Sequence, residues 1–269
     1  MMRAMNARPL ALITGASSGI GATFARKLAA RGYDLALVAR RKDKLAETAR
    51  DIESSHSVRA EILAADLTRD ADLLTVEDYI LRSPNLDFLV NNAGFGIAGR
   101  FFSLPIEGQD QMHRLHVIAP LRLMHAALSG MIARRRGTIV NVSSVSAFGQ
   151  NPGSVSYSAT KTGMNSFTEG LYMELKSAGS PVQVQALCPG FTLSEFHDAM
   201  HFDRKQIPAW MWMSADEVVD TSLRALSSGR LVVVPGFGYR LLVAMMRAFP
   251  RSIYHSLSIK YARSTGRDY

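Results

Sequence analysis

Three side chains near the middle of the chain, Ser144, Tyr157 and Lys161, have the types and spacing to move a proton. Tyr157 and Lys161 are four residues apart, so on a helix they lie on the same face. A free phenol has a pKa of about 10, and a fixed ammonium nearby favours the phenolate, which makes Tyr157 a usable acid or base. The Ser144 hydroxyl can hold a substrate oxygen. Because Tyr-x-x-x-Lys alone is common by chance and more often marks an ordinary helix, the rest of the chain must decide.

The segments around these side chains predict a strand and a helix that meet. Residues 137–142 (GTIVNV) form a β-branched run typical of a buried parallel strand, which ends in Ser143 and Ser144. After a Gly/Pro/Ser-rich loop, an amphipathic helix begins near Tyr157 and continues to Leu175. The end of the strand can therefore bring Ser144 beside this helix.

The whole chain alternates strand and helix patterns. Strands are predicted at residues 10–14, 35–39, 60–64, 86–90, 137–142, 182–187 and 231–234, and helices at 20–31, 42–54, 73–81, 109–134, 157–175 and 215–226. This alternation predicts an α/β fold, a Rossmann-like doubly wound parallel sheet of about seven strands with helices on both faces. No repeat or linker interrupts it, so we expect a single domain over residues 1–269.

Composition excludes several classes of protein. The single cysteine, Cys188, excludes an internal disulfide framework and a cysteine-based metal cluster, and no metal site is expected. No apolar run precedes the first strand, and no uninterrupted apolar run approaches bilayer length, so we expect neither a secretory signal nor a membrane span. A cytoplasmic location follows as the expectation.

The net charge of +8 is concentrated near the C-terminal end. Residues 240–269 contain six arginine or lysine side chains against one aspartate. Nothing in the chain places basic residues along a reading helix or among aromatic side chains, which argues against a nucleic-acid partner. The basic run at 134–136 is interpreted as a solvated helix end.

A glycine-rich turn follows the first predicted strand. Residues 14–21 read Thr-Gly-Ala-Ser-Ser-Gly-Ile-Gly and open the first helix. Glycines let a backbone approach a pyrophosphate, and a helix N-terminus offers it free N–H groups and a positive dipole. An isolated glycine cluster is as often a simple tight turn, but the place between a strand and a helix is the one that dinucleotide binding requires.

Six motifs in order make the chain resemble the short-chain dehydrogenase/reductase family over roughly residues 10–234. They are the turn at 14–21, Asp66-Leu67, Asn91-Asn92-Ala93-Gly94, Ser144, Tyr157-x-x-x-Lys161 and Pro189-Gly190-Phe191-Thr192. The resemblance implies an oxidoreductase that interconverts a carbonyl and a secondary alcohol by hydride transfer to or from a nicotinamide cofactor.

The resemblance also implies a role for each motif. Ser144 would orient the substrate oxygen, Tyr157 would donate or accept the proton, and Lys161 would bind the cofactor ribose and keep Tyr157 acidic. Hydride transfer itself belongs to the cofactor. Cofactor contacts are implied for Gly15, Ser17, Ser18, Ile20, Gly21, Asp66, Leu67, Asn92, Ala93, Gly94, Tyr157, Lys161, Pro189, Gly190 and Thr192.

The end of the second strand bears on the choice of cofactor. NAD-dependent members of the resembled family usually carry an acidic residue there, whereas this chain has Ala39 followed by Arg40, Arg41 and Lys42. An arginine can bind a 2′-phosphate bidentately, and a carboxylate would repel it. NADP is therefore the expected cofactor, with Arg40 as its 2′-phosphate contact. A solvated basic turn is the alternative.

One position departs from the family pattern. The family usually has an asparagine about 28 residues before the serine, and here that place falls on His116. The backbone carbonyl of the asparagine is thought to support a water-linked proton path. His116 is therefore a candidate catalytic residue that could substitute for it, or a plain helix residue.

The segment at 192–214 is unusually apolar and is predicted to form a lid over the substrate. It contains Phe196, Met200, Phe202, Ile207, Trp210, Met211, Trp212 and Met213. Methionine accommodates irregular apolar shapes, so such a lid suits a lipophilic carbonyl or alcohol such as a fatty-acyl chain or a steroid-like ring. Packing of these side chains on the core or on a second subunit is the alternative.

Residues 240–269 form a basic, amphipathic C-terminal extension interrupted by Pro250. We expect a helix pair that packs on the sheet edge or against another subunit of a homodimer or homotetramer, and that helps to cover the active site. Adsorption to an anionic membrane surface is the less favoured alternative.

Two other functions fit the same residues. One is a catalytically idle relative that binds NADPH as a sensor or partner module, and the intact Ser-Tyr-Lys trio argues against it. The other is a membrane-associated lipid reductase. Activity with ketones would separate the first from an enzyme, and liposome flotation would identify the second.

Overall fold

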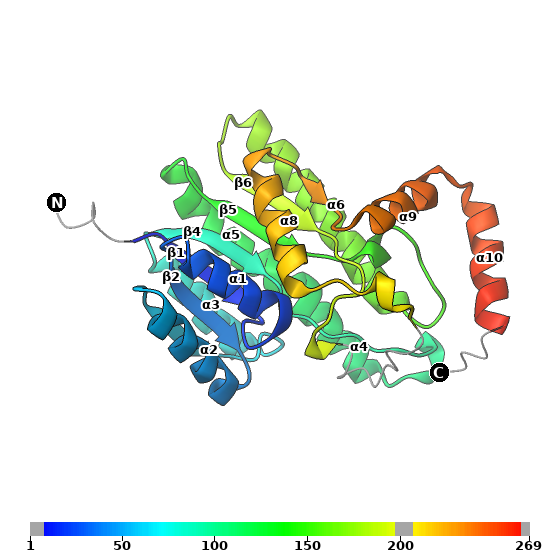
Figure 1. Cartoon of the computed structure of the whole chain (residues 1–269), viewed down its shortest axis with the longest axis horizontal. Coiled ribbons are helices and arrows are strands. Elements are labelled where there is room, and N and C mark those ends of the chain that lie inside the picture. Colours follow the sequence, from blue (N-terminus) through cyan, green and yellow to red (C-terminus); the bar gives the residue numbers. More distant parts are fainter. Residues whose placement is uncertain (1–7, 197–206, 265–269) are drawn as a thin grey trace.

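The computed structural model describes residues 8–196 and 207–264, which form one α/β unit around a seven-stranded parallel sheet (Figure 1). The strands are β1 (Leu10–Thr14), β2 (Asp34–Ala39), β3 (Ala60–Ala64), β4 (Leu86–Asn91), β5 (Thr138–Val142), β6 (Gln183–Leu187) and β7 (Val232–Val233). Their order is β3-β2-β1-β4-β5-β6-β7. The predicted doubly wound fold is confirmed, although β7 is shorter than expected.

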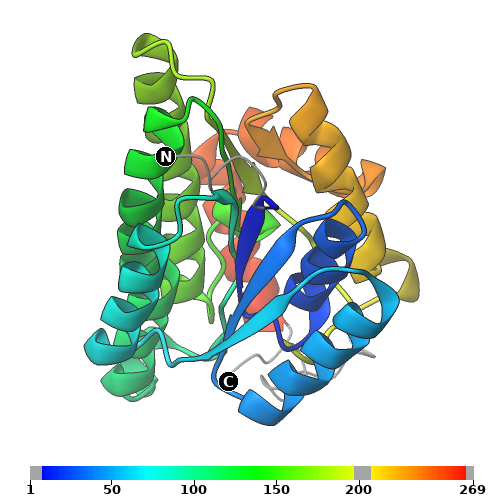
Figure 2. The same cartoon turned by 90° about the vertical axis from the view of Figure 1, so that its left-hand side faces the viewer.

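Helices cover both faces of the sheet, which lies between two helical layers in Figure 2. The helices are α1 (Gly19–Ala29), α2 (Lys42–Ser55), α3 (Asp70–Leu81), α4 (Ile106–His113), α5 (Ala119–Ala133), α6 (Val155–Ser177), α8 (Ala215–Ser227), α9 (Phe237–Ala248) and α10 (Arg251–Ser264). Alternate residues of β1 separate the two cores. Ala11 and Ile13 pack with α1, α2 and α8, whereas Leu10 and Leu12 pack with α3, α5 and α6.

The strand order creates the position of the site. From β1 the chain proceeds outward through β2 and β3, and then returns to place β4 on the other side of β1. At such a reversal the loops that follow neighbouring strands diverge and leave a crevice at the carboxyl ends. The motifs after β1, β3, β4, β5 and β6 all lie at this edge because every strand runs in the same direction.

The long central helical region differs from the sequence prediction. It begins earlier, at Ile106, and a π-helical turn at Arg114–Ile118 separates α4 from α5. Pro120 lies in the first turn of α5 and has no N–H to donate to the carbonyl of His116. The missing bond accounts for a widened turn at this point, and π-turns of this kind are frequent at functional sites.

By length and composition, the stretch Ile106–Ala133 could cross a membrane, which the sequence analysis did not anticipate. Its most apolar window has a mean hydropathy of 1.3 and is 44% buried. The buried side chains of α5, among them Leu123, Met124 and Met131, pack on the sheet with α3. These contacts are those of a core helix.

Candidate active site

A cavity of about 1210 Å³ opens at the carboxyl ends of the strands and gathers nearly all of the predicted site residues. Those that line it are Gly15, Ser17, Ser18, Ile20, Arg40, Asp66, Leu67, Asn92, Ala93, Gly94, Ser144, Tyr157, Lys161, Pro189, Gly190 and Thr192. Gly21 and His116 lie behind this lining. The predicted motifs therefore converge on one site, although they are spread over about 180 residues of sequence.

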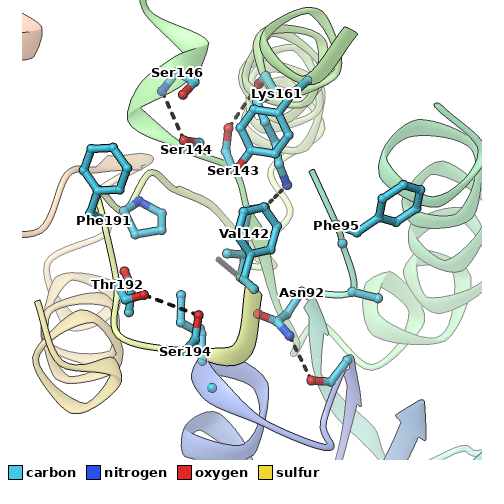
Figure 3. A pocket seen from close by; sticks show the side chains of 18 of the residues that line it. Asn92, Phe95, Val142, Ser143, Ser144, Ser146, Lys161, Phe191, Thr192 and Ser194 are labelled. Atoms are coloured by element: carbon cyan, nitrogen blue, oxygen red, sulfur yellow. Dashed lines mark hydrogen bonds between the residues drawn. The ribbon is translucent and has the colours of Figure 1, made fainter. Parts of the chain in front are cut away.

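The side chains of Ser144, Tyr157 and Lys161 meet between β5 and α6. Lys161 is buried, and its Nζ donates a 2.8 Å hydrogen bond to the carbonyl oxygen of Val142, as Figure 3 shows. Ser143 donates its hydroxyl to the backbone carbonyl of Lys161 at 3.1 Å, which ties the end of β5 to α6. Ser144 Oγ accepts a 3.1 Å hydrogen bond from the backbone N–H of Ser146 and also contacts the Tyr157 phenol.

Burial shifts the pKa values of Tyr157 and Lys161 in opposite directions. It raises the pKa of Tyr157 to about 12, and the hydrogen bond with Ser144 offsets only part of that shift. Burial also lowers the pKa of Lys161 to about 8. Desolvation is the largest cause of both shifts, because it disfavours the charged form of each group. The role predicted for Lys161 in keeping Tyr157 acidic stays a prediction. The Lys161 Nζ is bonded to Val142 and lies 5.7 Å from the centre of the Tyr157 ring.

The glycine-rich turn is held by the motif that follows β4. The Asn92 amide donates to the carbonyl oxygens of Thr14 and Gly15 at 2.9 and 3.2 Å. The Thr14 hydroxyl in turn accepts from the backbone N–H groups of Asn92 and Ala93. Asn92 therefore shapes the turn, and its amide group is used internally.

Glycine is required at two positions of this turn. Gly15 has φ +66°, and a Cβ there would lie 2.7 Å from the Asn92 amide nitrogen. A Cβ on Gly21 would lie 2.3 Å from the carbonyl oxygen of Gly15, so Gly21 permits α1 to pack against the turn. Gly21 thus supports the cofactor cleft from behind and is not part of its surface.

His116 is fully engaged in the interior. Its Nε2 accepts a hydrogen bond from the backbone N–H of Phe95 at 3.1 Å, and its Nδ1 lies 3.0 Å from the Thr160 hydroxyl. That hydroxyl donates to the carbonyl of Tyr157, so it is free to accept from Nδ1–H. His116 is therefore the neutral Nδ1–H tautomer and connects the loop after β4 with the helix that carries Tyr157. A Cβ on Gly94 would lie 2.8 Å from Nε2, so this contact also requires the glycine.

Burial of His116 should make stability depend on pH. Its pKa is lowered well below 6.5, first by desolvation and then by the charge of Lys161. The unfolded chain takes up this proton below about pH 6.5 while the folded chain does not, so the folded state loses stability as the pH falls. We expect the free energy of unfolding of the wild type to fall by about 1.4 kcal/mol more per pH unit below 6.5 than that of His116→Gln.

Urea unfolding of both proteins at pH 7.5 and 5.5 measures this difference. The other six histidines are shared by the two proteins, so their contributions cancel. Parallel pH profiles would show that His116 is not the titrating group.

Backbone pairing anchors the first residues of the predicted lid. Thr192 pairs with Met213, and the backbone N–H of Met213 donates to the Phe191 carbonyl at 2.9 Å. Between these paired residues, Phe196, Ile207 and Met211 line the cavity. Met200 and Phe202 lie outside the described residues.

Neither tryptophan of the predicted lid faces the cavity. Trp210 is 78% exposed, and Trp212 packs against Phe191 with ring centres 5.4 Å apart. Neither is part of the cavity wall. Met213 packs with the core cluster that contains α8, as the alternative interpretation of this segment proposed.

The C-terminal helices contribute to the cavity wall, which the sequence motifs did not specify. Tyr239, Leu242 and Met246 of α9, together with Ser258 and Ala262 of α10, line it. The Tyr239 hydroxyl donates to the carbonyl of Met211 at 2.6 Å and accepts from the N–H of Phe191 at 3.0 Å. A Cβ on Gly190 would fall within the Tyr239 ring. The sequence signal available was an apolar periodicity, which does not say what a helix faces.

The helix α10 lies beyond α9, at the right in Figure 1. Its Tyr254 hydroxyl bonds to the carbonyl of Gln150 and the side chain of Asn151 in the loop before α6. The predicted helix pair is therefore present, with its second member joined to an active-site loop instead of the sheet edge.

Comparison with known proteins agrees with this geometry. The family model for short chain dehydrogenase matches residues 9–205. The chain belongs to the short-chain dehydrogenase family. The match includes the glycine-rich turn and every residue of the trio, and it ends before the two C-terminal helices.

Solved structures extend the likeness to nearly the whole chain. A short-chain dehydrogenase from Sphingobium yanoikuyae in complex with NADPH is 34% identical, with a TM-score of 0.81, and the likeness covers 96% of this chain and 95% of that one. The bulky-bulky ketone specific alcohol dehydrogenase from Comamonas testosteroni is 30% identical, with a TM-score of 0.77 and coverage of 96% and 94%.

A relative from Homo sapiens, inactive hydroxysteroid dehydrogenase-like protein 1, is 29% identical over 194 residues. The match covers 71% of this chain and 58% of the human protein. Because this relative is named as inactive, membership of the family does not by itself establish catalysis.

Proposed function

We propose that the protein is an NADP(H)-dependent oxidoreductase that interconverts a lipophilic ketone and a secondary alcohol. The observation that carries this proposal is the meeting of Ser144, Tyr157 and Lys161 at the wall of a cavity that also contains the glycine-rich turn. A proton donor and a dinucleotide site around one space are what such a reaction requires, and these residues would supply both.

The residues present fit a dinucleotide. The N-terminus of α1 at Ser18 has no side-chain cap, so its N–H groups remain available to a pyrophosphate. Asp66 lines the cavity, and its carboxylate accepts hydrogen bonds from the N–H and hydroxyl of Thr68 at 3.1 and 2.8 Å. This carboxylate would meet the adenine. Arg40 would hold the 2′-phosphate. NADPH, when bound, supplies the hydride.

Tyr157 would protonate the carbonyl oxygen during reduction. Its pKa of about 12 keeps the phenol protonated at neutral pH, which is the state that a donor needs. Ser144 would orient the same oxygen through its hydroxyl, whose position is fixed by the Ser146 N–H. Lys161, buried and held by Val142, would present its ammonium to the ribose side of the cavity.

The substrate end of the cavity is apolar, and this supports a lipophilic substrate. Its walls come from three separate parts of the chain, namely the loop after β4, the lid and α9. The apolar side chains are Phe95, Ile97, Phe196, Ile207, Met211, Leu242 and Met246. Burial of apolar area at about 25 cal/mol per Å² favours ketones with large hydrocarbon groups over short ones.

NADPH oxidation with a panel of ketones tests the proposal. We expect turnover that rises with the apolar bulk of the ketone, with kcat/KM at least tenfold higher for a steroid-like or long-chain ketone than for acetone, because each extra buried CH₂ contributes about 0.8 kcal/mol. Absence of turnover across the panel, with NADPH bound, would instead support the idle, NADPH-binding alternative.

We further propose that the protein forms a homodimer or homotetramer in the cytoplasm. Exposed apolar side chains lie on α9, on α10 and at the corner between them, and surfaces of this kind commonly pack against another subunit. They are Phe237, Leu241, Met245, Phe249, Ile253 and Leu257. Adsorption of this stripe to an anionic membrane, with Arg240, Arg247 and Arg251 nearby, stays the alternative.

A further inference from the structure

An acidic side chain at the start of the lid crosses the mouth of the cofactor cleft. Glu195 Oε2 lies 2.7 Å from Arg41 Nη2, and Glu195 Oε1 lies 2.5 Å from Lys44 Nζ. Arg41 precedes α2 directly after the end of β2, whereas Glu195 follows β6 on the opposite side of the switch point. The salt bridge therefore links the two sides of the cleft, and both Arg41 and Glu195 line the cavity.

The residue next to Glu195 lies on the phosphate-binding turn. A Cβ on Gly19 would lie 2.9 Å from the Ser194 Cβ, so Ser194 covers the first residue of α1. Figure 3 shows Ser194 beside this blue segment. Arg41 Nη2 also donates to the hydroxyls of Ser17 and Ser18 at 3.1 and 3.4 Å. The segment 194–195 thus lies over the helix end where a pyrophosphate would bind.

The groups that hold the Glu195 carboxylate are those that bind a phosphate. A guanidinium beside an ammonium is a donor set for carboxylates and phosphates alike. Arg41 and Lys44 follow Arg40, at the strand end where the 2′ position of an adenine ribose is expected. The Glu195 carboxylate therefore forms ion pairs with the cations that the 2′-phosphate would otherwise bind.

We propose that Glu195 competes with the 2′-phosphate of NADP(H) for Arg41 and Lys44, and thereby sets how strongly the protein prefers the phosphorylated cofactor. This inference rests on the NADP(H) dependence proposed above. A 2′-phosphate would displace the carboxylate and release the first residues of the lid, whereas the 2′-hydroxyl of NAD(H) would leave the bridge in place.

The size of the effect follows from exposure. The side chains of Glu195, Arg41 and Lys44 are each nearly half exposed, and ion pairs of this kind are weak. A divalent phosphate can therefore replace the carboxylate. Removal of the competing charge should tighten binding of the phosphorylated nucleotide by roughly three- to fivefold.

Isothermal titration of the cofactor-free protein with 2′,5′-ADP and with 5′-AMP, which differ only in the 2′-phosphate, tests the inference without any turnover. We expect Glu195→Gln to bind 2′,5′-ADP roughly three- to fivefold more tightly than the wild type and 5′-AMP within about twofold. Glu174→Gln is the matched control, because it removes the same charge from an exposed site on α6 outside the cavity. In an Arg41→Ala background the gain from Glu195→Gln should shrink.

Three outcomes would overturn the inference. Unchanged or weaker binding of 2′,5′-ADP by Glu195→Gln excludes competition, and an equal gain for both nucleotides shows only a general charge effect. In either case a wild-type preference for 2′,5′-ADP leaves the NADP(H) proposal intact. If neither the wild type nor the variant distinguishes the two nucleotides, NADP(H) dependence itself fails and the inference fails with it.

Discussion

Replacement of Tyr157 by phenylalanine is expected to reduce kcat for ketone reduction by about 10²–10⁴-fold while NADPH binding stays within about twofold. The change removes only the hydroxyl that would protonate the substrate oxygen. The ring remains to pack edge-on against His116 and beside Phe196, at centroid distances of 5.8 and 6.0 Å. Steady-state kinetics and NADPH titration by calorimetry measure the two effects separately.

A matched control lies on the same helix. Tyr172→Phe removes a phenolic hydroxyl from α6 outside the cavity, where the ring contacts Lys176, so turnover should be unchanged. Near-wild-type turnover by Tyr157→Phe would remove Tyr157 from the acid–base role and would move attention to Ser144.

The second large effect is expected at Arg40. In Arg40→Asp, the ratio of kcat/KM for NADPH to that for NADH should fall by about 10- to 100-fold, because charge-assisted hydrogen bonds of about 1.5–3 kcal/mol are lost. The new carboxylate would also repel the 2′-phosphate, and it would accept hydrogen bonds from the ribose hydroxyls of NADH. Arg40 is exposed, so the substitution should not disturb folding.

Charge reversal elsewhere on α2 provides the comparison. Arg50→Asp changes the net charge by the same amount at an exposed position outside the cavity, and the cofactor preference should persist. Equal kcat/KM values for NADPH and NADH in the wild type would contradict the assignment of Arg40. They would leave the basic turn after β2 as a solvated surface feature.

Much of the fold could be predicted from the sequence because its signals are local. β-branched runs such as 138–142 specify buried parallel strands, and the alternation with helical periodicity specifies a doubly wound sheet. The convergence of the motifs also follows, since parallel strands bring their carboxyl ends to one edge. Tyr157 and Lys161 share a helix face simply because they are four residues apart.

Other features depended on contacts between segments far apart in the chain, and no local pattern encodes those. Burial raises the pKa of Tyr157 and lowers that of Lys161, and a spacing of four residues on a helix does not reveal either shift. Desolvation depends on everything that surrounds a group, so it exists only after the chain has folded.

The partners of His116, Tyr239 and Glu195 also depend on contacts between segments that are far apart in the chain. His116 reaches Phe95 and Thr160, Tyr239 fixes the loop after β6, and Glu195 meets a cation 154 residues away. No local pattern in the sequence joins these residues to their partners. The sequence therefore determined the type of sheet, the motifs and their common edge. Tertiary packing decided the tautomer of the histidine, the helices that line the cavity and the carboxylate that pairs with Arg41.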